Sequence, residues 1–468
     1  MALKLFNTLT RSVQEFTPSD TSAKTAGMYC CGPTVYDFAH IGNWRTFVFA
    51  DLVRRTLEFS GYEVRHVMNV TDVEDKIIRR VQADQTTLRE FTGKFEAAFF
   101  EDLQALNCLP PHQTPRATEH IPEIVALIEK LVARGIAYQA GDGSVYFSIE
   151  KYRGCGCTYG QLQKLNLDEL RVGERVAADE YDKEAVADFA LWKARVPEDG
   201  KIFWPSPWGE GRPGWHIECS AMSMKALGET FDLHLGGEDL KFPHHEDEIA
   251  QSEGATGRPF VRHWLHGAHL LVEGRKMSKS LGNFFTLRDL LAMGFTGRDV
   301  RFLLLKTHYR ETFNFTIDGL HGAPASLSRI DECVDKLREI AGSKVAGPDT
   351  KLLVPFSAAL ADDLNVSAAW AVVFEWVRET NKRLTDNAMD ADAAAASLAA
   401  WEKVDTVLGV GTKARTEEIP AEIAALLEAR QAARKAKDFK QSDTIRDELK
   451  ARGWVIEDTP KGPKLKRV

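Results

Sequence analysis

Four residues that are spread along the sequence have side chains that could hold a metal ion. His244 and Glu248 are four residues apart in a segment that reads as a helix, so their side chains share one face. Cys219 precedes them, and Cys31 lies near the amino terminus. Two thiols, an imidazole and a carboxylate form a ligand set that suits zinc. Spacing alone leaves a second interpretation open, because the run HHEDE is also a good start for a solvated helix.

A second group of residues could bind a nucleotide. In CGPTVYDFAHIGNWRTF, residues 31–47, we expect a strand to end and a loop with His40, Gly42 and Asn43 to open a helix. Backbone amides and an imidazole at a helix amino terminus suit the phosphates of a nucleotide. For so short a motif, a loop that merely contains His and Gly is the alternative.

A third motif, GRKMSKSLGNF at residues 274–284, places Lys276 and Lys279 three residues apart with small residues nearby. Two ammonium groups on one side of a loop can neutralise charge that develops on a triphosphate. A basic loop is often only solvated. The occurrence of HIG and KMSKS in one chain is more specific than either motif alone.

The elements expected around these motifs alternate between strands and helices. The expected strands lie at residues 28–31, at 62–70, around Phe231 and at 263–272, and the expected helices lie at 45–59 and from Pro243 onward. Such alternation predicts an α/β fold with a mostly parallel sheet. Ligands of such sheets bind beyond the carboxyl ends of the strands.

The length of 468 residues predicts about three domains. We expect a first, α/β domain at residues 1–300, interrupted at about 82–203 by an insertion with the helix IPEIVALIEKLVARG and the hairpin YQAGDGSVYFS. A helical region is expected at 301–410. The basic carboxyl-terminal domain, 411–468, would begin with the interrupted stretch GTKARTEEIP and continue in helices.

Composition excludes several classes of protein. With 44% hydrophobic and 27% charged residues, the chain resembles globular proteins and not disordered ones. It has no run of about 18 apolar residues and no signal-peptide pattern at MALKLFNTLTRS, so a cytoplasmic address and no membrane partner are expected. Seven cysteines, an odd number, disfavour a secreted disulfide framework. Cys155 and Cys157 are expected to be surface thiols, not a second metal site.

The net charge of −8 is unevenly distributed. Residues 428–468 carry 12 Lys and Arg against 7 Asp and Glu, so an acidic body ends in a basic tail. A solvated terminal helix would account for this composition. The functional alternative is a contact with a polyanion such as RNA.

The HIG and KMSKS motifs together resemble the HIGH and KMSKS signatures of class I aminoacyl-tRNA synthetases. The resemblance implies a Rossmann-like catalytic domain in which His40, Asn43, Lys276 and Lys279 assist attack of an amino-acid carboxylate on the α-phosphate of ATP, with magnesium. Gly42 would also contact ATP. The chain departs from HIGH at Asn43, which replaces the second histidine. An amide can donate a hydrogen bond but cannot become cationic.

Further segments narrow the resemblance to cysteinyl-tRNA synthetases: LFNTLTRSVQEFTP, MNVTDVEDKI, GRPGWHIECSAM, PHHEDEIAQSE, DDLNVSAA and GWVIEDTPKG. This family implies that L-cysteine, ATP and tRNA(Cys) are the partners, that helical stem-contact and anticodon-binding domains follow the catalytic domain, and that the chain is a monomer with one zinc ion per subunit. The residues that match the family's sites are Cys31, Cys219, His244 and Glu248 for zinc, Thr71, Trp215 and His234 for cysteine, and Gly236, Gly237 and Asp239 near the ribose and amino group.

Other interpretations are weaker. A small-molecule ligase that joins cysteine to an amino sugar would share the zinc and ATP motifs, but it would lack the long carboxyl terminus. A noncatalytic RNA-binding protein built on a decayed synthetase would not be expected to keep these residues. GEGRPG, residues 209–214, fits a dinucleotide-binding motif, but it follows Pro-Ser-Pro-Trp instead of a strand. His245 is expected in helix packing or behind a metal ligand, and His263, His266 and His269 in ordinary strand positions.

Overall fold

The computed structural model of the chain describes residues 2–22, 24–163, 175–176, 188–278, 281–411, 420–459 and 462–467. The chain divides into two compact units, Met1–Gly411 and Thr412–Val468. Each unit has a hydrophobic cluster of its own. Among the described residues, no helix is long and apolar enough to cross a lipid bilayer.

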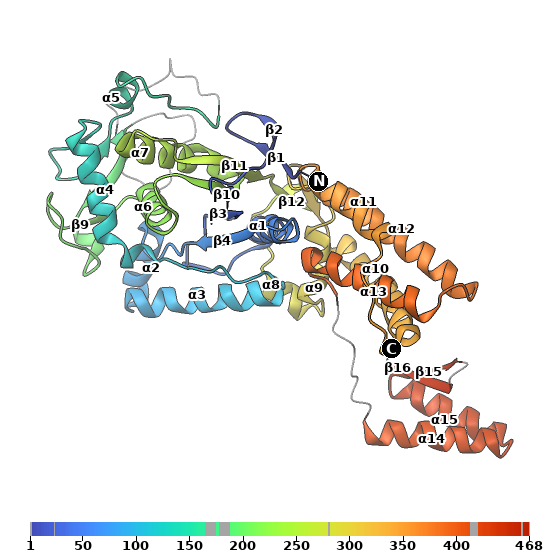
Figure 1. The fold of residues 1–468 in the computed structure, drawn as a ribbon. Coiled ribbons are helices and arrows are strands. Elements are labelled where there is room, and N and C mark those ends of the chain that lie inside the picture. The colour runs from blue at the N-terminus through green and yellow to red at the C-terminus, as the bar shows by residue number, and fades with distance from the viewer. Residues whose placement is uncertain are drawn as a thin grey trace. The chain divides into compact units, whose positions relative to one another are not determined.

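A four-stranded parallel sheet forms the centre of the first unit, in the order β11-β10-β3-β4 (Figure 1). The strands are β3 (Thr25–Cys30), β4 (Glu63–Met68), β10 (Phe231–Gly237) and β11 (Val261–Gly267). Helix α1 (Ile41–Phe59) connects β3 to β4 and packs on the sheet, so the predicted βαβ unit is confirmed. Cys30 belongs to the hydrophobic cluster under α1, whereas Cys31 belongs to the cluster on the opposite face.

Two helices cover that opposite face, α6 (Trp215–Leu227) and α7 (Glu246–Thr256), and they pack against each other. The helix expected from Pro243 onward is confirmed, with an unexpected first turn. Lys241–His245 forms a π-helical turn in which Phe242 is extended, at φ −142° and ψ 134°. A proline disfavours helical geometry at the residue before it, which accounts for Phe242.

The inserted segment adds helices and a mostly antiparallel sheet, β5-β6-β8-β7 with β9 on β8. Its elements are α2 (Asp75–Asp84), α3 (Leu88–Ala105), α4 (Ile121–Ala133), β5 (Ala137–Gln139), β6 (Val145–Phe147), α5 (Ile149–Gly154), β7 (Arg175–Val176), β8 (Asp188–Ala194) and β9 (Gly211–Pro213). The predicted helix and the predicted hairpin correspond to α4 and to β5-β6. The sequence GEGRPG contains strand β9 and not a phosphate loop, so the dinucleotide-binding interpretation is excluded.

The strand predicted at 263–272 is wrong in one respect, because it is broken at Ala268 and His269. β11 ends at Gly267, and β12 (Leu270–Val272) pairs instead with β13 (Arg275–Lys276) and with β14 (Phe313–Phe315). At the break, the Ala268 N–H donates to Tyr309 O at 2.7 Å, and the Phe313 N–H donates to His269 O at 3.1 Å. These contacts come from a distant part of the chain, which local strand propensity does not include.

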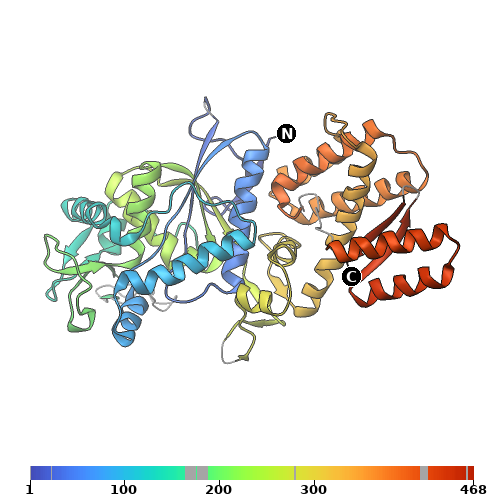
Figure 2. The ribbon, with the colours of Figure 1, turned by 90° about the horizontal axis from the view of Figure 1, so that it is seen from below.

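Helices dominate the rest of the first unit, as predicted. They are α8 (Leu287–Ala292), α9 (Gly297–Leu304), α10 (Ile317–Ala341), α11 (Thr350–Ala361), α12 (Val366–Thr385) and α13 (Ala391–Leu408), and a terminal hairpin of β1 (Lys4–Asn7) and β2 (Ser12–Glu15) begins the chain. In Figures 1 and 2, α4, α5 and β9 lie beside one end of the parallel sheet and α10–α13 beside the other, and in Figure 1 α3 runs below the sheet.

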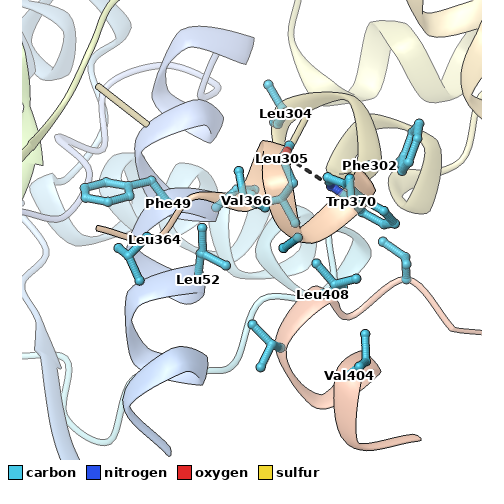
Figure 3. Close-up of a cluster of buried hydrophobic side chains, with 14 of the residues drawn as sticks. Phe49, Leu52, Phe302, Leu304, Leu305, Leu364, Val366, Trp370, Val404 and Leu408 are labelled. Carbon is cyan, nitrogen blue, oxygen red and sulfur yellow. Dashed lines mark hydrogen bonds between the residues drawn. The ribbon is translucent and has the colours of Figure 1, made fainter. Parts of the chain in front are cut away.

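A buried apolar cluster joins the helices α10–α13 to the catalytic part (Figure 3). Phe49 and Leu52 of α1 belong to the same cluster as Phe302 of α9 and Leu408 at the end of α13. The Trp370 Nε1–H of α12 donates to Leu305 O at 3.1 Å and thereby satisfies a buried donor. The cluster makes the first 411 residues one unit.

The second unit contains α14 (Ala421–Lys435), α15 (Phe439–Ala451), β15 (Trp454–Thr459) and β16 (Gly462–Arg467). The expectation of helices alone is therefore corrected, because β15 and β16 form an antiparallel hairpin. The helical pattern ends where Trp454 and Ile456 turn toward the small cluster with Leu449. Most of the stretch GTKARTEEIP lies outside the described residues.

Candidate active site and metal centre

His40 and Asn43 form the start of α1. His40 is the N-cap residue, and its Nδ1 accepts a hydrogen bond from the Asn43 backbone N–H at 3.1 Å. The Asn43 Oδ1 in turn accepts from the His40 backbone N–H at 3.0 Å. This reciprocal pair satisfies two backbone donors of the helix start. Asn43, the residue that departs from HIGH, therefore accepts a defined hydrogen bond with its side-chain amide oxygen.

The two predicted phosphate motifs lie together. The Ile41 N–H donates to Phe285 O at 2.8 Å, and His40 forms an isolated β-bridge with Thr286. A β-carbon at Gly42 would lie 3.2 Å from Met277 Cε, so the glycine permits close approach of the KMSKS segment. The start of α1 and the segment on both sides of that motif therefore form one site.

The lysines of KMSKS are described unequally. Lys276 ends β13 and is exposed, and its backbone O accepts from Asn283 Nδ2 at 3.2 Å. Asn283 also accepts from the Ser278 backbone N–H at 2.8 Å, so one side chain bridges the two sides of the loop. Lys279 lies outside the described residues.

A cavity of about 490 Å³ lies at the carboxyl ends of β3, β4 and β10. This is the edge at which ligands of parallel sheets bind. The predicted site residues that line it are Cys31, His40, Asn43, Thr71, Trp215, Cys219, Gly237, Asp239 and His244. Among the described residues, the predicted ones that do not line it are Gly42, Gly236, His234, Glu248 and Lys276.

The four expected metal ligands converge beside this cavity. The ligand atoms of Cys31, Cys219, His244 and Glu248 all lie within 4.8 Å of one another, and all four side chains are buried. Cys31 Sγ lies 3.9 Å from Cys219 Sγ and 3.6 Å from Glu248 Oε1. A zinc ion binds sulfur, nitrogen and oxygen at roughly 2.0–2.3 Å, so one ion could contact all four groups. The residues fit zinc in chemistry and in spacing.

Mutual contacts perturb the acidity of these groups. Burial raises the pKa of the Cys31 thiol well above its usual value. The hydrogen bond from Cys31 lowers the pKa of Cys219 to about 6, although burial opposes it. Burial lowers the pKa of His244, but its contact with Cys219 and the neighbouring carboxylates raise it overall. The contact between the two sulfurs thus favours ionisation of Cys219 before Cys31.

A second layer of polar groups orients His244. The His216 Nδ1 lies 2.8 Å from the His244 Nδ1, and the His216 Nε2 lies 3.4 Å from Asp247 Oδ2. Burial holds the pKa of His216 well below its usual value, so His216 is neutral and can accept the Nδ1–H of His244. Its acceptance leaves the His244 Nε2 facing Glu248, at 3.2 Å. A metal-binding histidine commonly donates its other N–H in this way.

Two histidines predicted to play structural roles lie closer to the cluster than expected. The His245 Nε2 is 3.3 Å from Cys31 Sγ, and its Nδ1 is 2.8 Å from the His266 Nε2. Cys31, His234, His245 and Glu248 form a second compact set of ligand atoms. We expected His245 either in helix packing or behind a metal ligand, and its contact with Cys31 fits the second role. His266 is a strand residue, as expected, but it also contacts His245.

The expected cysteine-pocket residues do not all reach the cavity. Thr71 follows β4, and its Oγ1 accepts from Asn69 Nδ2 at 3.2 Å. The Trp215 ring stacks on His244 with 4.2 Å between ring centroids. His234 is fully buried, and its Nε2 lies 2.9 Å from Glu248 Oε2. The structure therefore places His234 against Glu248 and not in the cavity wall.

The glycines at the end of β10 permit close packing. A β-carbon at Gly236 would lie 2.5 Å from the His245 ring, and one at Gly237 would lie 2.4 Å from Asp239 Oδ1. A larger residue at either position would therefore force the His245 ring or the Asp239 side chain to move. Gly237 and Asp239 line the cavity, whereas Gly236 makes room for His245.

Sequence reasoning missed His216, Asn69, Lys76 and Arg80. His216 is three residues before Cys219 on one helix, a spacing that could have indicated a shared face. Asn69 Oδ1 accepts from the Gly32 backbone N–H at 2.8 Å and joins the ends of two strands. Lys76 lies within the segment MNVTDVEDKI, but that resemblance assigned it no role, and only the fold shows that Lys76 and Arg80 line the cavity.

The sheet, the cavity at its carboxyl edge and the paired motifs define the first unit as a class I aminoacyl-tRNA synthetase catalytic domain. The family model described as tRNA synthetases class I (C) catalytic domain matches residues 17–324. The chain also has the fold of Mycobacterium tuberculosis methionyl-tRNA synthetase in complex with methionyl-adenylate, with a TM-score of 0.57, 14% identity and coverage of 82% of this chain and 90% of that one. A leucyl-tRNA synthetase ternary complex from Agrobacterium radiobacter K84 gives 0.58 and 11% identity over 84% of each chain.

More specific matches identify the family. Models described as the DALR domain and the cysteinyl-tRNA ligase anticodon binding domain match residues 355–412 and 416–463. The cysteine–tRNA ligase of Chlamydia felis is 46% identical over 100% of this chain and 98% of its own length. That of Protochlamydia amoebophila is 48% identical over 99% and 98%. The chain belongs to the cysteine–tRNA ligase family.

Proposed function

We infer that the chain catalyses the ATP-dependent ligation of L-cysteine to tRNA(Cys), with release of AMP and diphosphate. One observation carries this inference beyond family membership. A buried set of two thiols, an imidazole and a carboxylate adjoins the cavity that also contains His40 and Asn43. A site suited to a thiol and a site suited to phosphates would thus share one cavity.

In the first step, the carboxylate of cysteine would attack the α-phosphate of ATP, and diphosphate would leave with magnesium. We propose that His40 and the helix start contact the nucleotide, that Gly237 and Asp239 contact its ribose or the amino group, and that Lys276 and Lys279 offset the charge of the phosphates. In the second step, the terminal ribose hydroxyl of tRNA would attack the adenylate carbonyl and displace AMP. Catalysis would rest on positioning and charge stabilisation.

We propose that Cys31, Cys219, His244 and Glu248 hold one zinc ion, and that the site selects cysteine over serine. Zinc bound there would supply a soft Lewis acid, which favours a thiolate over a serine hydroxyl. Thr71 and Trp215 would orient the amino acid, and His234 would act through Glu248. Such metal-based discrimination would exceed the roughly 10 to 200-fold that a pocket typically achieves for one methylene group.

The test combines three measurements on the purified protein. Cysteine-dependent pyrophosphate exchange reports activation, and charging of tRNA(Cys) with each of the twenty amino acids reports specificity. Replacement of the metal by cobalt should give a sulfur-to-cobalt charge-transfer band that changes with cysteine and not with serine. A spectrum that ignores cysteine, or full selectivity in a folded Cys219→Ala variant, would mean that the metal is structural.

The domain roles are proposed on the same basis. Residues 1–300 would form the catalytic domain with an insertion at about 82–203, 301–410 would contact the tRNA stem, and 411–468 would read the anticodon. We further propose a monomer in the cytoplasm. All four metal ligands come from one chain, and all seven cysteines are free thiols, which suits a reducing compartment. Sedimentation of the protein with and without tRNA tests the monomer.

A further inference from the structure

Three side chains form a ledge in the wall of the catalytic cavity: Tyr36, Lys76 and Arg80. Lys76 and Arg80 are four residues apart on α2, so they share one face of that helix. Lys76 Nζ lies 5.4 Å and Arg80 Cζ lies 5.5 Å from the centroid of the Tyr36 ring. Both cations are close enough to be attracted by the ring, so the tyrosine holds two positive charges at one place.

Further contacts fix the ledge to the cavity. The Arg80 Nη1 donates to Tyr36 O at 3.2 Å, which ties α2 to the loop that leads to His40. At the start of α2, Asp75 pairs with Lys193 at 3.0 Å and with Arg212 at 2.5 Å. These two cations come from β8 and β9, so the inserted sheet anchors the helix that carries the ledge.

Acidic groups near the ledge reduce its net positive charge. Arg80 lies 3.5 Å from Asp37, and their side chains are 45% and 28% exposed, so solvent screens the pair. Glu74 also lines the cavity. The negative charge of Asp75 is balanced by its two partners from the inserted sheet. The cavity therefore has a second cationic place, on elements different from those that carry the KMSKS motif.

We propose that Lys76 and Arg80 bind the phosphodiester backbone at the single-stranded 3′ end of tRNA, and that Tyr36 positions them. This proposal rests on the proposed function, in which the terminal ribose must enter the cavity. The phosphates that precede that ribose must then pass the cavity wall. Single-stranded RNA is commonly held by cations that follow its backbone. The phosphates of ATP are assigned instead to the start of α1 and the KMSKS segment.

The experiment compares Lys76→Ala and Arg80→Ala with Arg79→Ala. Arg79 is the adjacent, exposed cation of the same helix, and it does not line the cavity. Exchange of pyrophosphate without tRNA should stay within about twofold in all three variants, since no tRNA phosphate takes part. In charging, loss of either ledge cation should raise the KM for tRNA by about tenfold, as for one charged contact. The slope of log affinity against log salt concentration should become shallower by about one, the value expected for one lost phosphate contact. Arg79→Ala should change neither.

Two further measurements separate a specific contact from a structural effect. Lys76→Arg and Arg80→Lys keep the charge and should restore most of the charging. A tRNA(Cys) transcript trimmed of its single-stranded 3′ end should bind wild type and Arg80→Ala equally, because it lacks the contacted phosphates. A remaining difference with the trimmed transcript would overturn the proposal, since the contact would lie elsewhere on the RNA.

The remaining outcomes show whether the ledge binds phosphates of ATP, phosphates of tRNA or neither. If the ledge variants lose exchange as strongly as charging, their ligand is ATP and the proposal is wrong. If they charge tRNA like wild type, the ledge binds no RNA. If the wild-type protein exchanges pyrophosphate but charges no tRNA, the proposed function fails before the ledge is tested.

Discussion

The two thiols near the cavity, Cys31 and Cys219, contact each other. Cys31 donates to Cys219 across 3.9 Å, so the pKa of Cys219 falls to about 6 while burial keeps the pKa of Cys31 high. Metal binding requires both sulfurs as thiolates, so uptake of an ion must release the proton of Cys31. The acidity of this pair therefore makes metal affinity depend on pH.

We expect the affinity for cobalt to rise with pH by about tenfold per unit for each proton released. Below pH 6 the loss should become steeper, because Cys219 then takes up a proton as well. Cobalt titrations of the metal-free protein, followed by absorbance between pH 5 and 8, measure this dependence. An affinity that does not change over this range would show that these thiols are not the ligands.

Substitution of Tyr159 tests whether the groups behind His244 contribute to metal affinity. Its OH donates to Asp247 Oδ1 at 2.6 Å, and Asp247 faces His216, which contacts His244. Tyr159→Phe should speed zinc loss to a chelator and lower zinc affinity by roughly 10-fold, as loss of a supporting contact typically does.

Tyr138 supplies the matched control. Its OH donates to Asp188 at 2.9 Å within the same inserted segment, outside the metal centre. Tyr138→Phe should leave zinc loss unchanged. Equal zinc loss in both variants would attribute the effect to the inserted segment as a whole.

At the residue scale, spacing along one helix indicated which side chains meet, but it did not indicate the contacts made between elements. His244 and Glu248 could be paired because four residues on a helix bring side chains together, at 3.2 Å here. The contact of His245 with His266 joins residues on two elements, and no local pattern encodes it. The burial of His234 follows from β10 lying between two strands, which the sequence alone did not establish.

Among the elements, α13 ends in a set of side-chain contacts that come from other helices. Arg301 is fully buried, and it donates to Leu408 O at 2.6 Å and to Asp51 of α1 at 2.6 Å. Arg55 donates to Thr406 O at 2.8 Å. The last turn of α13 leaves backbone carbonyls without helical partners, and these arginines satisfy them. The contacts tie the end of the helical region to the helix that begins at the active site.

We expect Arg301→Leu to destabilise the first unit by about 3–5 kcal/mol, because it leaves the buried Asp51 carboxylate short of a partner. Burial raises the pKa of Asp51, but Arg301 and Arg55 lower it overall. Its stabilising effect is therefore present above the unfolded pKa and is lost as pH falls below it. Urea unfolding at neutral and at acidic pH measures both effects, and the penalty should shrink in acid.

The surface pair of Arg338 and Asp335 provides the comparison, at 2.8 Å on α10. Arg338→Leu should cost less than about 1 kcal/mol, as exposed pairs usually do. Similar losses in the two variants would contradict the role given to Arg301.

Local signals predicted most elements but not where they end. Hydrophobic spacing indicated α1 and α4, and the turn residues of YQAGDGSVYFS indicated the hairpin of β5 and β6. The break between β11 and β12 depends on pairing with β14, which lies far along the chain. The hairpin of β15 and β16 was missed because the helical pattern before it was extended to the end of the chain.

On the scale of the whole molecule, the basic tail lies within the second unit. The second unit has its own cluster of Ile423, Ile445, Leu449 and Trp454, and residues 428–468 carry the excess of Lys and Arg. The catalytic cavity and the metal ligands all lie in the first unit. Activation of cysteine and recognition of tRNA are therefore expected to be separable.

A chain that ends at Gly411 should keep pyrophosphate exchange within about twofold, since it retains every group assigned to ATP and cysteine. Its charging of tRNA(Cys) should fall by at least about 100-fold at low tRNA concentration, because several phosphate contacts are lost together. The defect should appear mainly in the KM for tRNA, with the salt dependence of charging reduced.

The control is a chain that keeps both units but has four surface cations of the second one replaced: Lys435, Lys437, Lys440 and Lys450 as glutamine. It should show the same exchange as wild type and a lower rate of charging. Its charging should also fall less steeply with added salt than that of wild type. If the shortened chain is folded yet loses exchange and charging equally, the second unit supports the active site itself. In that case its basic surface is not a separate reader of RNA, since a module that only binds tRNA cannot alter a reaction from which tRNA is absent.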